Sequence, residues 1–260
     1  MKLNISKANG TQNHFLIIYS NDSSIHNQNN IIEIVKSSNS NRIDGVLVLS
    51  DSHSSDFKMD YYNNDGTWES MCANGARCAA LYMYEKNIVT SEKMTIEAGD
   101  GQHEVEIIGA NNVKLKMSTP KYCSKKIELL EVSGFHIDSG ATHFVVEYKN
   151  IDDKTVKDLG SKIRHDKEFE PRGINVNFYE VLNSHEIDVK TYEKGVEDLM
   201  MSCGSGSVAC VYHLSKTEQV ESPVHVHVKG GTLQVDFDND WENVWILGHA
   251  EIENDIDINI

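Results

Sequence analysis

Two short segments that begin alike decide the fold, CANGA at residues 72–76 and CGSGS at residues 203–207. In each, a cysteine and a glycine precede a run of small and apolar residues, which is typical of a buried helix. We therefore expect helices over 75–85 and 206–216. The two cysteines are 203 − 72 = 131 positions apart, half of the 260-residue chain. This repetition predicts a duplicated module of about 125 to 130 residues.

The repeat places a boundary between two modules near residues 118–121. We expect an N-terminal module over 1–118 and a C-terminal module over 119–248. Within the last segment, 249–260, residues 251–260 alternate acidic with apolar residues, which is typical of a solvated edge strand or tail. We expect this segment to complete the N-terminal module.

The rest of the chain contains more predicted strands than predicted helices, which indicates an α/β (α+β) fold. Two further helices are expected, over 31–38 and 156–164. Short runs rich in β-branched and aromatic residues predict the strands. They are expected over 14–19, 45–49, 94–98, 103–108, 113–117, 142–148, 176–181, 186–192, 224–229, 232–237 and 244–247.

Composition excludes several classes of partner. The chain has 40 acidic and 24 basic residues and a formal net charge of -16, which disfavours nucleic acid and anionic membrane surfaces. Its apolar runs are strand-sized, far short of the roughly 20 residues of a membrane helix. The first residues do not match a signal peptide, so we expect a cytoplasmic protein. Five cysteines, an odd number, argue against a disulfide framework.

The two cysteine segments suit proton transfer. A cysteine at the start of a helix lies among unpaired backbone N–H groups, which can lower its pKa well below about 8.5 and make it a usable base. The same N–H groups can hold a carboxylate. Two such segments facing one substrate would place Cys72 and Cys203 on opposite faces of an α-carbon. One thiol would remove the proton and the other would return it, inverting the centre.

No cofactor or metal is expected. The chain shows no convincing pyridoxal lysine context, dinucleotide fingerprint or Walker lysine. Cys72 and Cys78 are separated by five residues and Cys203 and Cys210 by six, whereas zinc pairs usually have two to four. Cys78, Cys123 and Cys210 are expected to be packing residues. The alternating histidines His225 and His227 are expected on a solvated strand face.

Three runs carry a resemblance to a known family: YYNNDGTWESMCANGARC (61–78), GINVNFYEV (173–181) and TYEKGVEDLMMSCGSG (191–206). In order and spacing they resemble the signatures of diaminopimelate epimerases. Weaker similarities lie at 7–15, 139–146, 229–235 and 247–252, so the resemblance covers essentially the whole chain. It implies two pseudo-symmetric domains, each a curled mixed sheet around a central helix, with the active site in the interdomain cleft. It also implies a cofactor-independent isomerase.

The resemblance implies a set of site residues by position. Cys72 and Cys203 would be the catalytic thiols. The substrate-binding residues would be Asn13, Asn63, Ala73, Asn74, Asn175, Glu193, Lys194, Gly204 and Ser205. Each asparagine could instead be a turn or cap residue, and His143, which the resemblance places near the cleft, could be structural.

Two positions depart from the family pattern. Lys194 stands where the family usually has an arginine that pairs with the distal carboxylate, and Ala73 stands where glycine is usual. A lysine offers a point charge rather than a bidentate fork. These departures concern the substrate more than the chemistry. The resemblance itself implies an epimerase that interconverts LL- and meso-diaminopimelate and supplies lysine and peptidoglycan precursors. A racemase of another amino acid such as histidine, and a non-catalytic amino-acid binding module, stay open as alternatives. The expected partner is a small amino-acid substrate, with a homodimer as the assembly considered.

Overall fold

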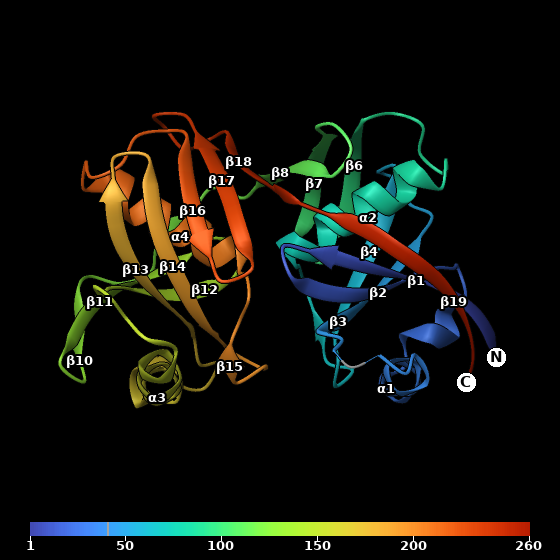
Figure 1. The fold of residues 1–260 in the computed structure, drawn as a ribbon, viewed down its shortest axis with the longest axis horizontal. Coiled ribbons are helices and arrows are strands. Elements are labelled where there is room, and N and C mark those ends of the chain that lie inside the picture. Colours follow the sequence, from blue (N-terminus) through green and yellow to red (C-terminus); the bar gives the residue numbers. More distant parts are fainter. Residues whose placement is uncertain (41) are drawn as a thin grey trace. The chain divides into compact units, whose positions relative to one another are not determined.

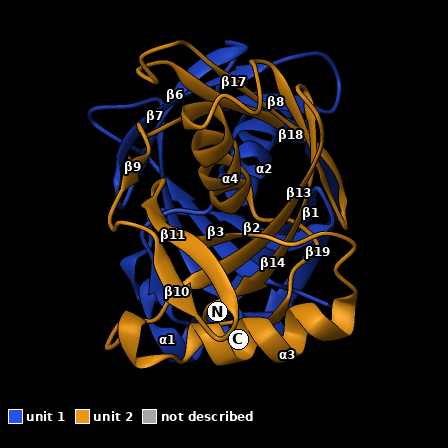
Figure 2. Cartoon of the chain, turned by 90° about the vertical axis from the view of Figure 1, so that its left-hand side faces the viewer, with its two compact units in different colours: residues 1–116, 248–260 blue, residues 117–247 orange. Residues whose placement is uncertain are grey.

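The computed structural model describes residues 1–40 and 42–260, which divide into two compact units. Unit 1 comprises residues 1–116 and 248–260, and unit 2 comprises residues 117–247 (Figure 2). Unit 1 is therefore made of two separate stretches of chain, whereas unit 2 is continuous. The boundaries expected for the two duplicated modules, after residues 118 and 248, remain a prediction from the sequence.

Unit 1 is a mixed sheet with two α-helices (Figure 1). In sheet order its main strands are β19, β1, β2, β3, β4, β6, β7 and β8. The β2–β3 and β4–β6 pairs are parallel and the others are antiparallel. The elements are β1 (Lys2–Gly10), β2 (Asn13–Tyr19), η1 (Ser23–His26), α1 (Gln28–Ser37), β3 (Gly45–Ser50), β4 (Phe57–Asn63), β5 (Trp68–Glu69), α2 (Ala73–Glu85), β6 (Lys93–Ala98), β7 (Gly101–Ile107), β8 (Asn112–Met117) and β19 (Glu251–Asn259).

Unit 2 repeats this arrangement. In sheet order its main strands are β10, β11, β12, β13, β14, β16, β17 and β18. The elements are β9 (Lys121–Tyr122), β10 (Ile127–Leu129), β11 (Val132–Asp138), β12 (Thr142–Glu147), α3 (Asp153–Arg164), η2 (Lys167–Phe169), β13 (Asn175–Asn183), β14 (Glu186–Glu193), β15 (Asp198–Leu199), α4 (Gly204–Lys216), β16 (Val224–Val228), β17 (Gly231–Phe237) and β18 (Val244–His249).

The strand pairings of the two units follow one pattern. From β1 to β8 and from β11 to β18 the successive pairs are antiparallel, parallel, antiparallel, parallel, antiparallel and antiparallel. Register matches individual residues as well. Val46 pairs with Tyr62 as Val176 pairs with Tyr192, so Asn63 and Glu193 occupy equivalent strand ends. The expected fold class, two similar α/β units, is confirmed.

Strands β2, β3 and β12 contain uninterrupted buried apolar runs, 15–18, 46–49 and 144–146, because helices cover both faces of each sheet. In unit 1, Ile31 and Ile34 of α1 join a buried cluster with Leu16 and Val48 on one face of the sheet. Helix α2 packs against the opposite face, contacting β1, β2, β3, β4, β6, β7 and β19. In unit 2, α3 packs onto β13 and β14 in the same way, and α4 contacts β12, β13, β14 and β17.

Helices α2 and α4 begin two residues earlier than expected and end where expected, at Glu85 and Lys216. The segment that follows each cysteine therefore forms the first helical turn itself. Among the described residues, no helix is long and apolar enough to span a membrane.

Candidate active site

Each cysteine segment forms a half-site at the start of a buried helix. Cys72 is the N-cap of α2 with φ -138° and ψ 110°, and Cys203 is the N-cap of α4 with φ -135° and ψ 107°. The sulfur of Cys72 accepts a hydrogen bond from the Gly75 N–H at 3.4 Å, whereas Cys203 makes no side-chain cap bond. The two backbones are thus built alike, and the environments of the two thiols differ.

The glycine three residues after each cysteine lets the helix approach the sheet closely. A Cβ at Gly75 would lie 2.8 Å from Cδ2 of Leu47, and a Cβ at Gly206 would lie 2.1 Å from Nδ2 of Asn177. Leu47 and Asn177 occupy equivalent positions on β3 and β13, since each lies one residue beyond the matched valines. The glycines of the two motifs are therefore required by packing, with an apolar contact in unit 1 and a polar contact in unit 2.

The half-site of unit 1 brings two of the expected substrate residues together. Nδ2 of Asn74 donates to Oδ1 of Asn13 at 3.2 Å, and Nδ2 of Asn13 donates to the Asp44 carboxylate at 2.7 Å. Both asparagine side chains are buried, because Asn13 lies at the start of β2 beneath the hairpin turn and Asn74 lies in the first turn of α2. Asp44 also accepts from the His14 N–H.

Arg77, one turn further along α2, belongs to this half-site and was not among the residues expected from the sequence. The side chain is fully buried, and it donates to the Ala73 carbonyl, to Oδ1 of Asn74 and to the Thr11 hydroxyl at 3.3, 2.8 and 3.2 Å. Burial lowers the pKa of Arg77 to about 10, so the guanidinium is charged at neutral pH. An arginine in a helix otherwise rich in small residues was the sequence signal for it.

Asn63 and Ala73 are placed differently from Asn13 and Asn74. Asn63 ends β4, and its Oδ1 accepts from the Tyr61 hydroxyl at 2.9 Å while its backbone opens the turn to Thr67. The structure thus shows the turn role considered for this residue. Ala73 is the first residue of α2 and is buried, with its carbonyl bound by Arg77.

The half-site of unit 2 contains a chain of buried hydrogen bonds that ends near the thiol. Nδ2 of Asn177 donates to the Thr191 hydroxyl at 2.6 Å, and Oδ1 of Asn177 lies 2.8 Å from Nδ1 of His143. Nε2 of His143 lies 2.9 Å from Oγ of Ser205, which lies 3.8 Å from the sulfur of Cys203. His143, Asn177 and Thr191 are fully or almost fully buried.

The directions of these bonds follow from the orientation of the Asn177 side-chain amide. Because the Asn177 amide nitrogen faces Thr191, its oxygen must accept, and His143 carries its proton on Nδ1. Burial lowers the pKa of His143 to about 4, despite the opposing hydrogen bond to Asn177, so the ring is neutral and its Nε2 accepts from the Ser205 hydroxyl. The oxygen of Ser205 is then oriented to accept a hydrogen bond from the Cys203 thiol.

A cysteine at the start of a helix can have a lowered pKa, but the pKa of Cys203 is raised. Burial raises the pKa of its thiol well above the ordinary value, and the charge of Glu193 raises it further. The Gly206 N–H and the Ser205 hydroxyl oppose this shift but do not outweigh it. The helix start therefore does not outweigh burial and the charge of Glu193, and the pKa of the Cys203 thiol lies above its ordinary value.

The remaining expected residues of unit 2 lie at the adjoining strand ends. Glu193 is the last residue of β14, and the Lys194 N–H donates to Oδ1 of Asn175 at 2.8 Å. Asn175 opens β13 and is buried. Gly204 and Ser205 form the first turn of α4. The structure thus groups Asn175 with Lys194, and Glu193 and Ser205 with Cys203.

The other cysteines lie apart from this chemistry. Cys78 and Cys210 are fully buried in α2 and α4, and burial raises the pKa of Cys78 to about 12 and that of Cys210 further. Cys123 is exposed rather than packed, so the packing role expected for it is wrong. Among the described residues, no three His, Cys, Asp or Glu side chains gather as a metal site.

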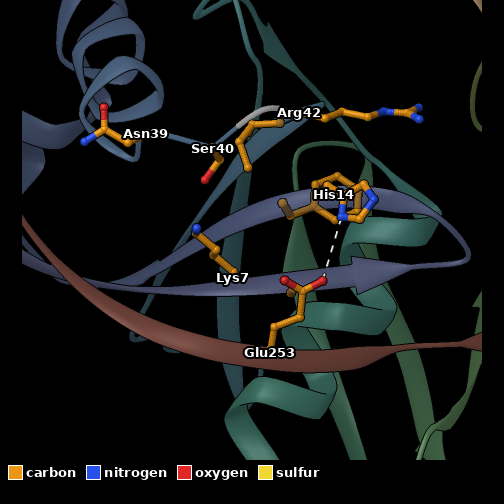
Figure 3. A pocket seen from close by; sticks show the side chains of 9 residues that line it. Lys7, His14, Asn39, Ser40, Arg42 and Glu253 are labelled. Atoms are coloured by element: carbon orange, nitrogen blue, oxygen red, sulfur yellow. Dashed lines mark ion pairs between the residues drawn. The ribbon is translucent and has the colours of Figure 1, made fainter.

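A pocket of unit 1 lies on the outer face of the β1–β2 hairpin. Its volume is about 240 Å³, and Figure 3 shows Lys7, His14 and Arg42 around it, with Glu253 of β19 paired to His14 at 3.8 Å. His14 alternates with the inward-facing Asn13 along β2, so the pocket and Asn13 lie on opposite faces of the strand. The pocket contains neither cysteine and is separate from the half-site.

Comparison with known proteins identifies the relatives of this chain. A family model described as "Diaminopimelate epimerase" matches residues 5–123 and 135–252. The diaminopimelate epimerase of Aquifex aeolicus is 35% identical over 79% of this chain and 76% of its own length. That of Chlorobaculum tepidum is 35% identical over 80% of this chain and 82% of its own length.

Solved structures share the fold at low sequence identity. A PhzF-family phenazine biosynthesis protein from Bacillus anthracis aligns with a TM-score of 0.77 and 13% identity over 100% of both chains. A probable proline racemase from Agrobacterium radiobacter K84 aligns with a TM-score of 0.77 and 12% identity, covering 99% of this chain and 93% of its own. At such identities the likeness shows the fold alone.

Together with the two cysteine half-sites, these relatives define the class of the protein, an isomerase of the epimerase type. The chain belongs to the diaminopimelate epimerase family. The resemblance drawn from the cysteine segments is thereby confirmed.

Proposed function

We propose that the chain interconverts LL- and meso-diaminopimelate by removing a proton from one face of an α-carbon and returning one to the other face. Membership of the family supports the substrate. The observation that carries the mechanism is the pair of N-cap cysteines with matching backbone angles, one at the start of each unit's buried helix. No cofactor takes part in this scheme.

The mechanism uses the two thiols in unlike resting roles. In one direction Cys72, as thiolate, takes the α-proton and becomes a thiol, and Cys203 gives its proton to the opposite face and becomes a thiolate. The raised pKa of Cys203 beside Glu193 suits the proton donor of this direction. In the reverse direction the roles exchange. First-turn N–H groups at Ala73, Asn74, Gly204 and Ser205 would hold the carboxylate while charge develops on it.

The test follows deuterium at the α-carbon in deuterated water. The wild type should exchange and epimerise LL- and meso-diaminopimelate, whereas Cys72→Ser and Cys203→Ser should each lose epimerisation by roughly 100-fold or more, since a general acid or base contributes that much. Cys123→Ser, at the exposed cysteine, is the matched control and should retain full activity. If both serine variants epimerised at the wild-type rate, the proton transfer would use other groups, whereas a wild type that neither exchanges nor epimerises diaminopimelate would be a binding module.

Substrate identity needs a separate comparison. Diaminopimelate should turn over much faster than lysine or histidine, which lack the distal carboxylate. Equal turnover of a single-headed amino acid would favour a racemase of that amino acid on the same fold. The homodimer considered from the sequence stays a prediction, which sedimentation velocity would test.

A further inference from the structure

We propose that Asp44 and Arg77 are positioning residues that set the amide orientation of Asn13 and Asn74. The kinetic part of this inference rests on the proposed function, in which Asn13 and Asn74 contact the substrate. The structural part rests on one continuous hydrogen-bond chain within unit 1: Asp44, Asn13, Asn74, Arg77.

The two ends of the chain fix its direction. An ionised carboxylate only accepts hydrogen bonds and a guanidinium only donates them. Nδ2 of Asn13 must therefore face Asp44, at 2.7 Å, and Oδ1 of Asn74 must face Nη2 of Arg77, at 2.8 Å. Between them, Nδ2 of Asn74 donates to Oδ1 of Asn13 at 3.2 Å. An asparagine flipped at either position would set donor against donor or acceptor against acceptor.

Arg77 also joins the two pieces of backbone that carry these asparagines. Its Nη1 binds the Ala73 carbonyl in the first turn of α2, and its Nη2 binds the hydroxyl of Thr11 in the β1–β2 turn. Thr11 has φ 55° and lies in the turn between β1 and β2, and Asn13 follows two residues later. The hydrogen bond from Arg77 to Thr11 therefore holds the turn that leads directly to Asn13. The guanidinium thereby holds the hairpin turn and the helix start in one arrangement.

The burial of Arg77 argues against a purely structural role. Its side chain is completely buried, its hydrogen bonds go to neutral groups, and Nε has no hydrogen-bond partner among the described residues. A buried charge whose hydrogen bonds go only to neutral groups costs stability, and an apolar side chain of similar volume would often pack as well. The equivalent position of α4, five residues after Cys203, is indeed a buried valine, Val208. Packing alone therefore does not require an arginine here.

The experiment combines substrate kinetics with NMR of the side-chain amides. Arg77→Met removes the charge while keeping a side chain of similar length, and Arg77→Lys keeps the charge but loses the planar guanidinium with its several donors. Asp44→Asn keeps the shape of the side chain, but its amide can donate as well as accept, so it no longer fixes the direction of the hydrogen bond to Asn13. Lys86→Met, at the C-cap of the same helix with a partly exposed ion pair to Asp255, is the matched control. For Arg77→Met and Asp44→Asn, KM for diaminopimelate should rise about tenfold or more, because a hydrogen bond to a charged group is disrupted. Arg77→Lys should fall between Arg77→Met and the wild type.

The split between kcat and KM separates positioning from folding. If Arg77 served only stability, its loss would reduce the folded, titratable enzyme and lower the apparent kcat while KM stayed unchanged. That result, with an unchanged KM in both Arg77→Met and Asp44→Asn, would overturn the proposal. Lys86→Met should keep the wild-type KM.

The NMR measurement needs no activity, so it stands even if the proposed function fails. The side-chain NH₂ signals of Asn13 and Asn74, assigned through Asn13→Ser and Asn74→Ser, should be protected from exchange with water in the wild type. Asp44→Asn should reduce protection at Asn13, and Arg77→Met should reduce it at Asn74. Unchanged protection in both variants would refute the chain. An inactive wild type whose amide signals respond as expected would refute the proposed function alone.

Discussion

Nε2 of the fully buried His143 lies 2.9 Å from the hydroxyl oxygen of the partly buried Ser205 in unit 2. The equivalent positions of unit 1 hold Phe15 and Asn74, since Phe15 pairs with Gly45 as His143 pairs with Asn175. The two half-sites therefore share a backbone plan but are supported by different side chains. A neutral imidazole supports the first turn of α4, and a buried guanidinium supports the first turn of α2.

The neutral state of His143 makes the protein sensitive to acid. The native ring has a pKa of about 4 and the unfolded ring about 6.5. Below pH 6.5 the unfolded chain binds a proton at this ring that the native chain does not. The contribution of the neutral ring to the free energy of unfolding is therefore fully present above pH 6.5 and is lost as the pH falls toward 4. The loss should approach about 3 kcal/mol. Denaturant unfolding of His143→Gln and the wild type at pH 7 and pH 4.5 should show a smaller loss in the variant.

The matched control is His225→Gln, at a half-buried histidine of β16. It should keep the acid sensitivity of the wild type. An equally steep loss of stability in His143→Gln would mean that other groups cause the acid sensitivity.

Removal of the Glu193 charge should make Cys203 more reactive. Burial raises the pKa of this thiol first and Glu193 raises it second, so Glu193→Gln should lower the pKa while burial keeps it above the ordinary value. The pH profile of Cys203 alkylation by iodoacetamide, followed by peptide mass spectrometry, should shift to lower pH. A profile that stays in place or moves to higher pH would show that Glu193 does not act on the thiol.

The two motif glycines should differ in their tolerance of a methyl group. At Gly206 the new Cβ would lie 2.1 Å from the Asn177 amide, which is held by Thr191 and His143 and cannot withdraw cheaply. At Gly75 it would meet the end of Leu47 at 2.8 Å, a flexible side chain. Gly206→Ala should therefore lower the free energy of unfolding by roughly 1–3 kcal/mol and Gly75→Ala by less. Urea denaturation of both variants measures the difference, and the reverse order would contradict the packing argument.

Lys194 should decide how strongly a distal carboxylate is recognised. Its backbone is anchored by Asn175, so the base of the side chain has a fixed position beside Glu193. Lys194→Met should raise KM for diaminopimelate about tenfold or more, because a charge-assisted contact is lost, while kcat changes less. Lys194→Arg is the conservative variant and should keep KM low. A KM unaffected by Lys194→Met would remove this residue from the substrate site.

Local sequence patterns predicted the helices that begin at a recognisable segment. Helices α2 and α4 were expected because small and apolar residues follow a cysteine and a glycine, and their ends were placed correctly. Strands β1, β4 and β11 were missed because polar residues or a glycine interrupt their apolar pattern. These strands lie between neighbours in the sheet, and pairing compensates for their weak local preference.

The cysteines of the candidate site could be predicted, but the groups that orient the first helical turns could not. Arg77 reaches Thr11, and Asn74 reaches Asn13, across some sixty residues of sequence that only the fold brings together. The raised pKa of Cys203 could not be predicted for the same reason. A helix start can be recognised from sequence, whereas the burial of the sulfur and the approach of Glu193 depend on the fold.

The discontinuity of unit 1 has a consequence for synthesis on the ribosome. Strand β1 pairs with β19 along almost its whole length, from Lys2 with Asn259 to Asn9 with Glu251. Residues 2–10 therefore leave the ribosome long before their partner, with one edge able to pair with another chain. Unit 2, which is continuous, can complete its sheet first. The nascent chain thus carries an unfinished sheet edge on β1 until residues 251–259 emerge.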